Sequence, residues 1–134
     1  MSESSESSER NGAQTEFKLS KVGIIMLGVS DLARSKAYYC DQLGMEVQTE
    51  FEGFVFLNGG GVTLALNTGV WNALGKQPGA TNVVFPVESV KAAHEGLLAR
   101  GVEFMGGPIN VNGPQWAANF RDPDGHLLSV FGPE

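Results

Sequence analysis

The chain has 134 residues, of which 42% are hydrophobic and 18% are charged, and this composition suits one globular domain. A formal net charge of −6 disfavours a nucleic-acid partner, because phosphate binding needs clustered Lys and Arg side chains. A single cysteine, Cys40, excludes an internal disulfide and a thiolate zinc cluster, and no apolar run reaches the length of a membrane span. We therefore expect a cytoplasmic small-molecule enzyme or binding protein that does not associate with a membrane.

Residues 1–18 are predicted to form a disordered acidic tail, and residues 19–134 to form a single domain. The first sixteen residues contain five Ser, four Glu and one Arg. They show no apolar period, so they cannot bury enough surface to offset the entropy lost on ordering. They also lack the basic start and apolar centre of a secretory signal.

The first half of the domain has the pattern of a strand, a helix and three further strands. Residues 22–29 form an apolar run that is typical of a strand covered on both faces. Ser30 or Asp31 can cap a helix over 31–43, which ends before Gly44. The three strands that follow are predicted over 45–51, 54–58 and 62–67.

The second half repeats this pattern. Its first strand, at 82–87, matches the strand at 22–29 at a constant offset of 58 residues. Val83 is therefore equivalent to Ile25, and Val87 is equivalent to Val29. A helix is predicted over 89–100, with strands over 102–106, 115–120 and 126–131. The chain is therefore predicted to contain two βαβββ modules, at about 21–68 and 80–132.

Three segments resemble those of a known family. They are Val29-Ser30-Asp31-Leu32-Ala33-Arg34-Ser35, then Tyr38-Tyr39 with Leu43-Gly44, and Arg121-Asp122-Pro123-Asp124-Gly125-His126. Together they resemble the vicinal oxygen chelate superfamily, which includes glyoxalase I, extradiol dioxygenases and bleomycin-resistance proteins. The resemblance implies an α+β fold in which two βαβββ modules form a cupped half-barrel around a central pocket, within a homodimer.

Most enzymes of that superfamily hold a divalent metal in the cup. The resemblance places the four ligand positions at Ile24, Ala65, Asn82 and Ser129. Ile and Ala offer no lone pair, and Asn and Ser offer only neutral oxygens, which cannot offset the desolvation of a dication. We therefore predict that the usual metal site is absent, and we expect no cofactor.

Other residues give no catalytic constellation. We interpret His94 and His126 as structural or surface residues, as is usual for a lone unpaired histidine. Cys40 lies beside Asp41, which would raise the pKa of the thiol, so it does not have the setting of a nucleophile. The catalytic residues therefore stay unknown at this stage.

Alternation along the strands leaves a cup wall of small and apolar side chains, which suits a flat ligand that is neutral or cationic. Trp71, between the modules, and Trp116, on the penultimate strand, would add aromatic surface. The predicted ligand-binding residues are Ile24, Met26, Phe56, Ala65, Asn67, Trp71, Asn82, Val84, Trp116, Ala118 and Ser129. In the alternative interpretation, these side chains simply fill the cup as core.

Two functions remain open, and a third, weaker possibility is a structural or regulatory partner protein that has kept the fold without a ligand. The first is a metal-independent binding protein similar to bleomycin-resistance-type members, which would hold an aromatic or apolar small molecule in the cup. The alternative is a diverged glyoxalase-superfamily enzyme, of lyase or dioxygenase type, with a non-standard or substrate-borne metal. The missing metal ligands favour the binding protein, and so does the absence of a positioned acid, base or nucleophile.

Overall fold

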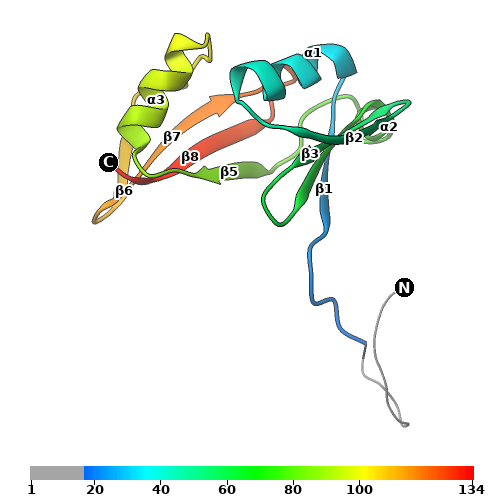
Figure 1. Cartoon of the computed structure of the whole chain (residues 1–134), viewed down its shortest axis with the longest axis horizontal. Helices are drawn as coiled ribbons and strands as arrows, with labels where there is room; N and C mark the ends of the chain where they lie inside the picture. Colours follow the sequence, from blue (N-terminus) through cyan, green and yellow to red (C-terminus); the bar gives the residue numbers. More distant parts are fainter. Residues whose placement is uncertain (1–16) are drawn as a thin grey trace.

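The computed structural model describes residues 17–134 (Figure 1). Apart from its last two residues, the predicted tail at 1–18 lies outside the described residues, and the division of the chain at residue 19 stays a prediction. The first module consists of β1 (Ile24–Gly28), α1 (Leu32–Ala37), the π-helix η1 (Tyr38–Gln42), β2 (Val47–Phe51), β3 (Phe54–Asn58) and β4 (Thr63–Asn67). After α2 (Thr68–Ala73), the second module consists of β5 (Asn82–Pro86), α3 (Val90–Ala99), β6 (Ile109–Asn112), β7 (Gln115–Arg121) and β8 (Leu127–Pro133).

The two modules have the same strand order. One sheet runs β1-β4-β3-β2 and the other runs β5-β8-β7-β6. In each sheet the first strand pairs in parallel with the last, and the remaining pairs are antiparallel. The predicted α+β fold with two βαβββ modules is therefore confirmed, and β1 and β5 are edge strands of their sheets.

The signals at the helix ends act as predicted. The Asp31 side chain accepts a hydrogen bond from the Arg34 N–H, and Ser89 does the same for the Ala92 N–H, so each residue caps a helix. Gly44 follows the first helical segment at φ 84°, a left-handed conformation that glycine adopts without strain. None of the helices in the described part of the chain has the length and hydropathy of a membrane span.

Two predicted elements differ from the structure. The strand expected at 102–106 is wrong, because only Phe104 forms an isolated bridge there, and the strand that pairs with β7 is β6 at Ile109–Asn112. The Gly-Gly-Pro sequence at 106–108 separates the bridge from β6, since glycine and proline both disfavour a continuous strand. The segment between the predicted strands at 62–67 and 82–87, for which no helix was predicted, begins with helix α2, which Asn67 caps through the Val70 N–H.

Helices α1 and α3 cover one face of the two sheets and leave the other face open. Figure 1 shows α1 and α3 on the same side of the two sheets. One continuous core lies beneath them and contains residues of both modules, with Tyr39, Leu57, Phe120 and Leu128 among its most buried side chains. The opposite faces of the sheets are therefore the predicted cup wall.

Candidate functional site

A cavity of about 970 Å³ lies where the edge strands β1 and β5 of the two modules approach each other. Its wall also includes the β3–β4 loop, helix α2 and the segment that leads from α2 into β5. The wall is mostly apolar, and Glu46 and His126 are its two ionisable side chains among the described residues. An apolar wall with few polar groups is typical of a small-molecule site.

Trp71 reaches this wall because α2 packs closely on β1. Asn67 fixes the start of α2, since its Oδ1 accepts the Val70 N–H at 2.8 Å and its Nδ2 donates to the Gly53 carbonyl at 2.8 Å. Gly28 allows the close approach, because a Cβ there would lie 2.6 Å from the Trp71 backbone nitrogen. The absence of a side chain at residue 28 therefore places the Trp71 ring in the cavity wall.

A neutral polar cluster lies on the open face of the second sheet. The Ser129 hydroxyl lies 2.6 Å from Asn119 Oδ1 and 3.1 Å from Asn82 Oδ1. The Ser129 hydroxyl has one proton, and it donates this proton to Asn119 Oδ1 in the shorter contact. The exposed Asn82 side chain, at the cavity wall, is then able to bind a polar group of a ligand.

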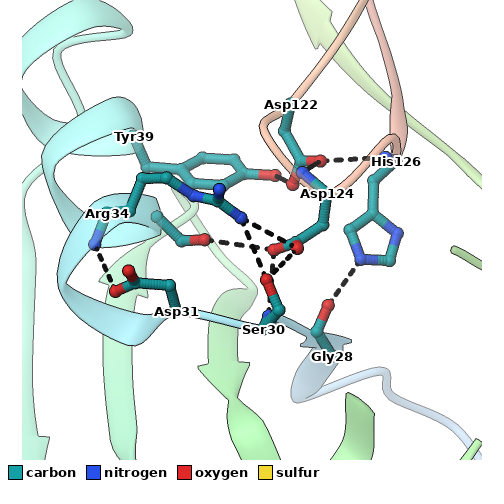
Figure 2. Close-up of polar contacts among 9 residues, drawn as sticks. Gly28, Ser30, Asp31, Arg34, Tyr39, Asp122, Asp124 and His126 are labelled. Atoms are coloured by element: carbon teal, nitrogen blue, oxygen red, sulfur yellow. Dashed lines mark hydrogen bonds and ion pairs between the residues drawn. The ribbon is translucent and has the colours of Figure 1, made fainter. Parts of the chain in front are cut away.

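The carboxylate of Asp124 joins the two modules (Figure 2). Its side chain is 3% exposed and comes from the β7–β8 turn of the second module. It accepts hydrogen bonds from the first module: from the N–H and hydroxyl of Ser30, from the Arg34 guanidinium at 3.1 Å and from the Ser35 hydroxyl. We call Asp124 with these three residues the module latch, and it fixes the turn against the β1–α1 connection.

Asp122 forms a second link across the same junction. Its carboxylate accepts the Tyr39 hydroxyl at 2.8 Å and the backbone N–H groups of Asp124 and His126 (Figure 2). Burial and the neighbouring Asp122 carboxylate raise the pKa of Tyr39 above its ordinary value, and the same two causes raise the pKa of Tyr38 to about 12. Both phenols are therefore held as neutral groups.

The predicted ligand-binding residues divide into three groups. Met26, Trp71, Asn82 and Val84 line the cavity. Ile24, Phe56, Ala65, Asn67 and Ser129 share the open sheet faces but lie outside the cavity wall. Within this second group, Ala65 is fully buried and both polar atoms of Asn67 are engaged in fixing α2, so neither side chain is available to a ligand.

The third group, Trp116 and Ala118, lies on the opposite face of its sheet from the predicted cup. Ala118 pairs directly with Val130, so both point toward the helix-covered core, where Ala118 is fully buried. Trp116 packs against the same core. The expectation that these two residues share a surface with Ser129 is therefore wrong, because Ser129 pairs with Asn119 and points to the other face.

Sequence analysis did not identify His126 as a residue of the site. It interpreted His126 as a structural or surface residue, and the structure places this residue, 5% exposed, in the cavity wall. The ring contacts the Gly28 carbonyl and packs edge-on to Trp71 with centroids 6.4 Å apart. These partners are far away in sequence, so no local pattern could have signalled the contacts.

The residues at the four metal-ligand positions do not fit a divalent ion. Ile24 and Ala65 have no donor atoms, and Ser129 shares its hydroxyl with the Asn82 and Asn119 amides. Across residues 17–134, no three His, Cys, Asp or Glu side chains come together in a metal-binding arrangement. We therefore derive no chemical step through a metal at these positions.

Cys40 has the environment expected of an unreactive thiol. Burial raises its pKa, and Asp41 and Glu50 act in the same direction while Lys36 opposes them. The effect of Asp41 agrees with the sequence argument, although burial is the larger cause. Because the thiolate is the nucleophilic form, a raised pKa disfavours a catalytic role for Cys40.

Comparison with known proteins decides the family. A model of the glyoxalase/bleomycin resistance protein/dioxygenase superfamily matches residues 21–130. The chain belongs to this superfamily. No curated protein is detectably similar to it in sequence.

Solved structures of the superfamily have the same fold. A glyoxalase/bleomycin resistance protein/dioxygenase from Nocardioides is 27% identical, with 88% of this chain and 86% of that chain covered at a TM-score of 0.75. A superfamily member from Sphaerobacter thermophilus is 25% identical, with 84% and 97% covered at a TM-score of 0.72. TnmS3, an antibiotic binding protein from Streptomyces sp. CB03234, is 24% identical, with 89% and 100% covered at a TM-score of 0.70, and this likeness shows the fold.

Proposed function

We propose that this chain binds a flat, partly apolar small molecule, neutral or cationic, in the cavity between β1 and β5. The observation that carries the proposal is the wall of that cavity, which is mostly apolar and includes the Trp71 ring. The volume of about 970 Å³ is large enough to enclose most of a drug-sized molecule. The fold that the chain shares with TnmS3, an antibiotic binding protein, supports the same function.

The charge of the wall supports a neutral or cationic ligand. Among the described residues that form it there is no Lys or Arg, and Glu46 is the single acidic side chain. An anionic ligand would lose its hydration on entry without gaining a cationic partner. A cation over the face of Trp71 gains an attractive interaction, and its charge is also opposite to that of Glu46.

We further propose that binding is independent of a metal. The polar groups nearest the predicted metal positions are the neutral side chains of Asn82, Asn119 and Ser129, and the Ser129 hydroxyl lies within hydrogen-bond distance of both amide oxygens. Such groups orient a ligand through hydrogen bonds. They do not supply the negative charge that a dication requires.

A homodimer is part of the proposal. Four large apolar side chains on the open sheet faces are between 48% and 64% exposed: Ile24, Phe51, Val84 and Ile109. Monomeric proteins rarely leave extended apolar surface of this kind in water. We expect a second copy of the chain to cover part of these faces. Light scattering that gives the mass of a monomer at micromolar concentration would contradict this.

The binding proposal is tested by thermal-shift screening with aromatic compounds of cationic, neutral and anionic charge. We expect cationic and neutral compounds to raise the Tm and anionic ones to leave it unchanged. The cavity is then filled by Val84→Trp, which places an indole on the β5 wall. This variant is expected to abolish the Tm increase caused by the best compound.

Val111→Trp is the matched control. Val111 is an exposed valine on the edge strand β6, as Val84 is on β5, but it lies outside the cavity. We expect this variant to keep the response of the unmodified protein. Stabilisation by anions alone, or an equal response from the two variants, would show that the ligand does not occupy this cavity.

A further inference from the structure

His126 has a polar atom that the fold does not use. The residue follows the β7–β8 turn, and its backbone N–H donates to Asp122 Oδ1 at 2.8 Å. Its ring Nε2 lies 2.6 Å from the Gly28 carbonyl oxygen (Figure 2). Because a carbonyl can only accept, Nε2 carries the proton of this contact, and the neutral ring presents a lone pair at Nδ1.

This Nδ1 has no partner inside the protein. Within residues 17–134 it is the one buried side-chain nitrogen or oxygen without a hydrogen bond. Buried acceptors in native proteins are almost always satisfied, so an exception calls for a partner that comes from outside the chain. The ring itself cannot turn to find one, because Nε2 is engaged by Gly28.

The surroundings of Nδ1 contain no competing donor that the structure assigns to it. Asp122 and Asp124 lie nearest in sequence, but their carboxylates accept hydrogen bonds, from Tyr39 and within the module latch, and cannot donate to a lone pair. Trp71 meets the imidazole edge-on with ring centroids 6.4 Å apart. Both rings line the cavity between β1 and β5, so an acceptor and an aromatic surface occur at the same end of it.

We propose that Nδ1 of His126 accepts a hydrogen bond from an O–H or N–H group on the ligand. The ligand class is then an aromatic molecule with a donor on its ring, such as a phenol or an aryl amide, with its ring against Trp71. The atom is buried in the unliganded protein, so a ligand reaches it only by displacing the groups that cover it. This inference rests on the proposed function and adds the polar group that the ligand must carry.

The test uses two probes of nearly equal shape, 2-naphthol and 2-methoxynaphthalene. The naphthol has a hydroxyl proton, and the methyl ether has none. We expect the unmodified protein to bind the naphthol about tenfold more tightly, the effect of one net hydrogen bond. His126→Phe is expected to bind both probes equally, and His126→Gln, whose amide can donate to Gly28 and accept from the ligand, is expected to restore part of the preference.

A measurement on the unmodified protein removes any dependence on variant folding. The chain has two histidines, and His94 lies on α3 outside the cavity, against Phe104. In ¹⁵N spectra of the imidazoles, the naphthol is expected to shift Nδ1 of His126 and to leave both nitrogens of His94 unchanged. The ether is expected to shift neither residue.

The outcomes separate this inference from the proposed function. Equal affinity for the two probes, or an unchanged Nδ1 resonance at saturating naphthol, would overturn the role of His126. The proposed function would survive that result if other aromatic compounds still raise the Tm in the thermal-shift screen, and it fails if none does.

Discussion

Replacing Asp124 with Ala is expected to loosen the junction between the modules. The carboxylate is 3% exposed and accepts hydrogen bonds from Ser30, Arg34 and Ser35 of the first module. Ala removes the acceptor and leaves all of these donors in place. The change therefore tests whether one side chain of the β7–β8 turn holds the two modules together.

The size of the expected destabilisation depends on which of these donors water can reach in the variant. Ser30 is exposed and the Arg34 side chain is 49% exposed, so water replaces much of what they lose, and solvent screens the ion pair. Ser35 is fully buried, and a buried donor that loses its partner costs about 1–3 kcal/mol. With the lost bonds to the charged acceptor added, we expect the free energy of unfolding to fall by about 3 kcal/mol. For a domain of this size, that is a fall in Tm of about 10 °C.

The assay is thermal unfolding followed by circular dichroism, with Asp31→Ala as the matched control. Asp31 lies at the start of α1, the helix that contains Arg34 and Ser35, and its replacement removes the same charge. Its side chain accepts a single capping hydrogen bond, from the Arg34 N–H. Loss of such a cap costs about 1 kcal/mol. If Asp124→Ala is no more destabilising than Asp31→Ala, the module latch does not stabilise the junction.

Three further predictions concern single groups. Tyr38 and Tyr39 are the only tyrosines, and burial raises the pKa of both. The stability that these phenols contribute is complete below about pH 10, the ordinary pKa of tyrosine. It is lost as the pH rises through the pKa of Tyr38, which is about 12. Phenolate absorbance should therefore not increase near pH 10, the ordinary pKa of tyrosine, while the circular dichroism is native, and such an increase would contradict this. In a denaturant titration, Gly28→Ala should lower the free energy of unfolding by about 2 kcal/mol, because the added Cβ meets the backbone of α2. Gly96→Ala, whose Cβ meets nothing, should not destabilise the protein in the same titration. Iodoacetamide should modify Cys40 more slowly in the folded than in the unfolded protein by mass spectrometry, since burial raises the pKa of the thiol; equal rates would refute this.

Most of the fold could be predicted because its determinants are local. The caps at Asp31 and Ser89, the glycine after the first helix and the alternating apolar residues all act within a few positions. The prediction of a strand at 102–106 failed because the position of β6 is decided by its pairing with β7. Helix α2 was missed because its cap, Asn67, belongs to the preceding strand.

The site was less predictable than the fold, because its contacts join distant segments. Met26, Asn82 and Val84, which alternation assigned to the cup wall, lie on edge strands and line the cavity, and their role in ligand binding stays a prediction. Trp116 was assigned to the wrong face, because sequence does not give the register of β7 against β8. The contact of His126 with Gly28 spans 98 positions and depends on how the two modules meet.

Ligand-induced quenching of each tryptophan alone tests the central claim, that the ligand occupies the cavity between β1 and β5. The chain has two tryptophans, of which Trp71 lines the cavity and Trp116 packs against the core. Trp116→Phe and Trp71→Phe each leave one of them as the reporter. We expect a compound that raises the Tm to quench Trp71 in the first variant and to leave Trp116 unchanged in the second. Quenching of Trp116 with Trp71 unaffected would contradict the account.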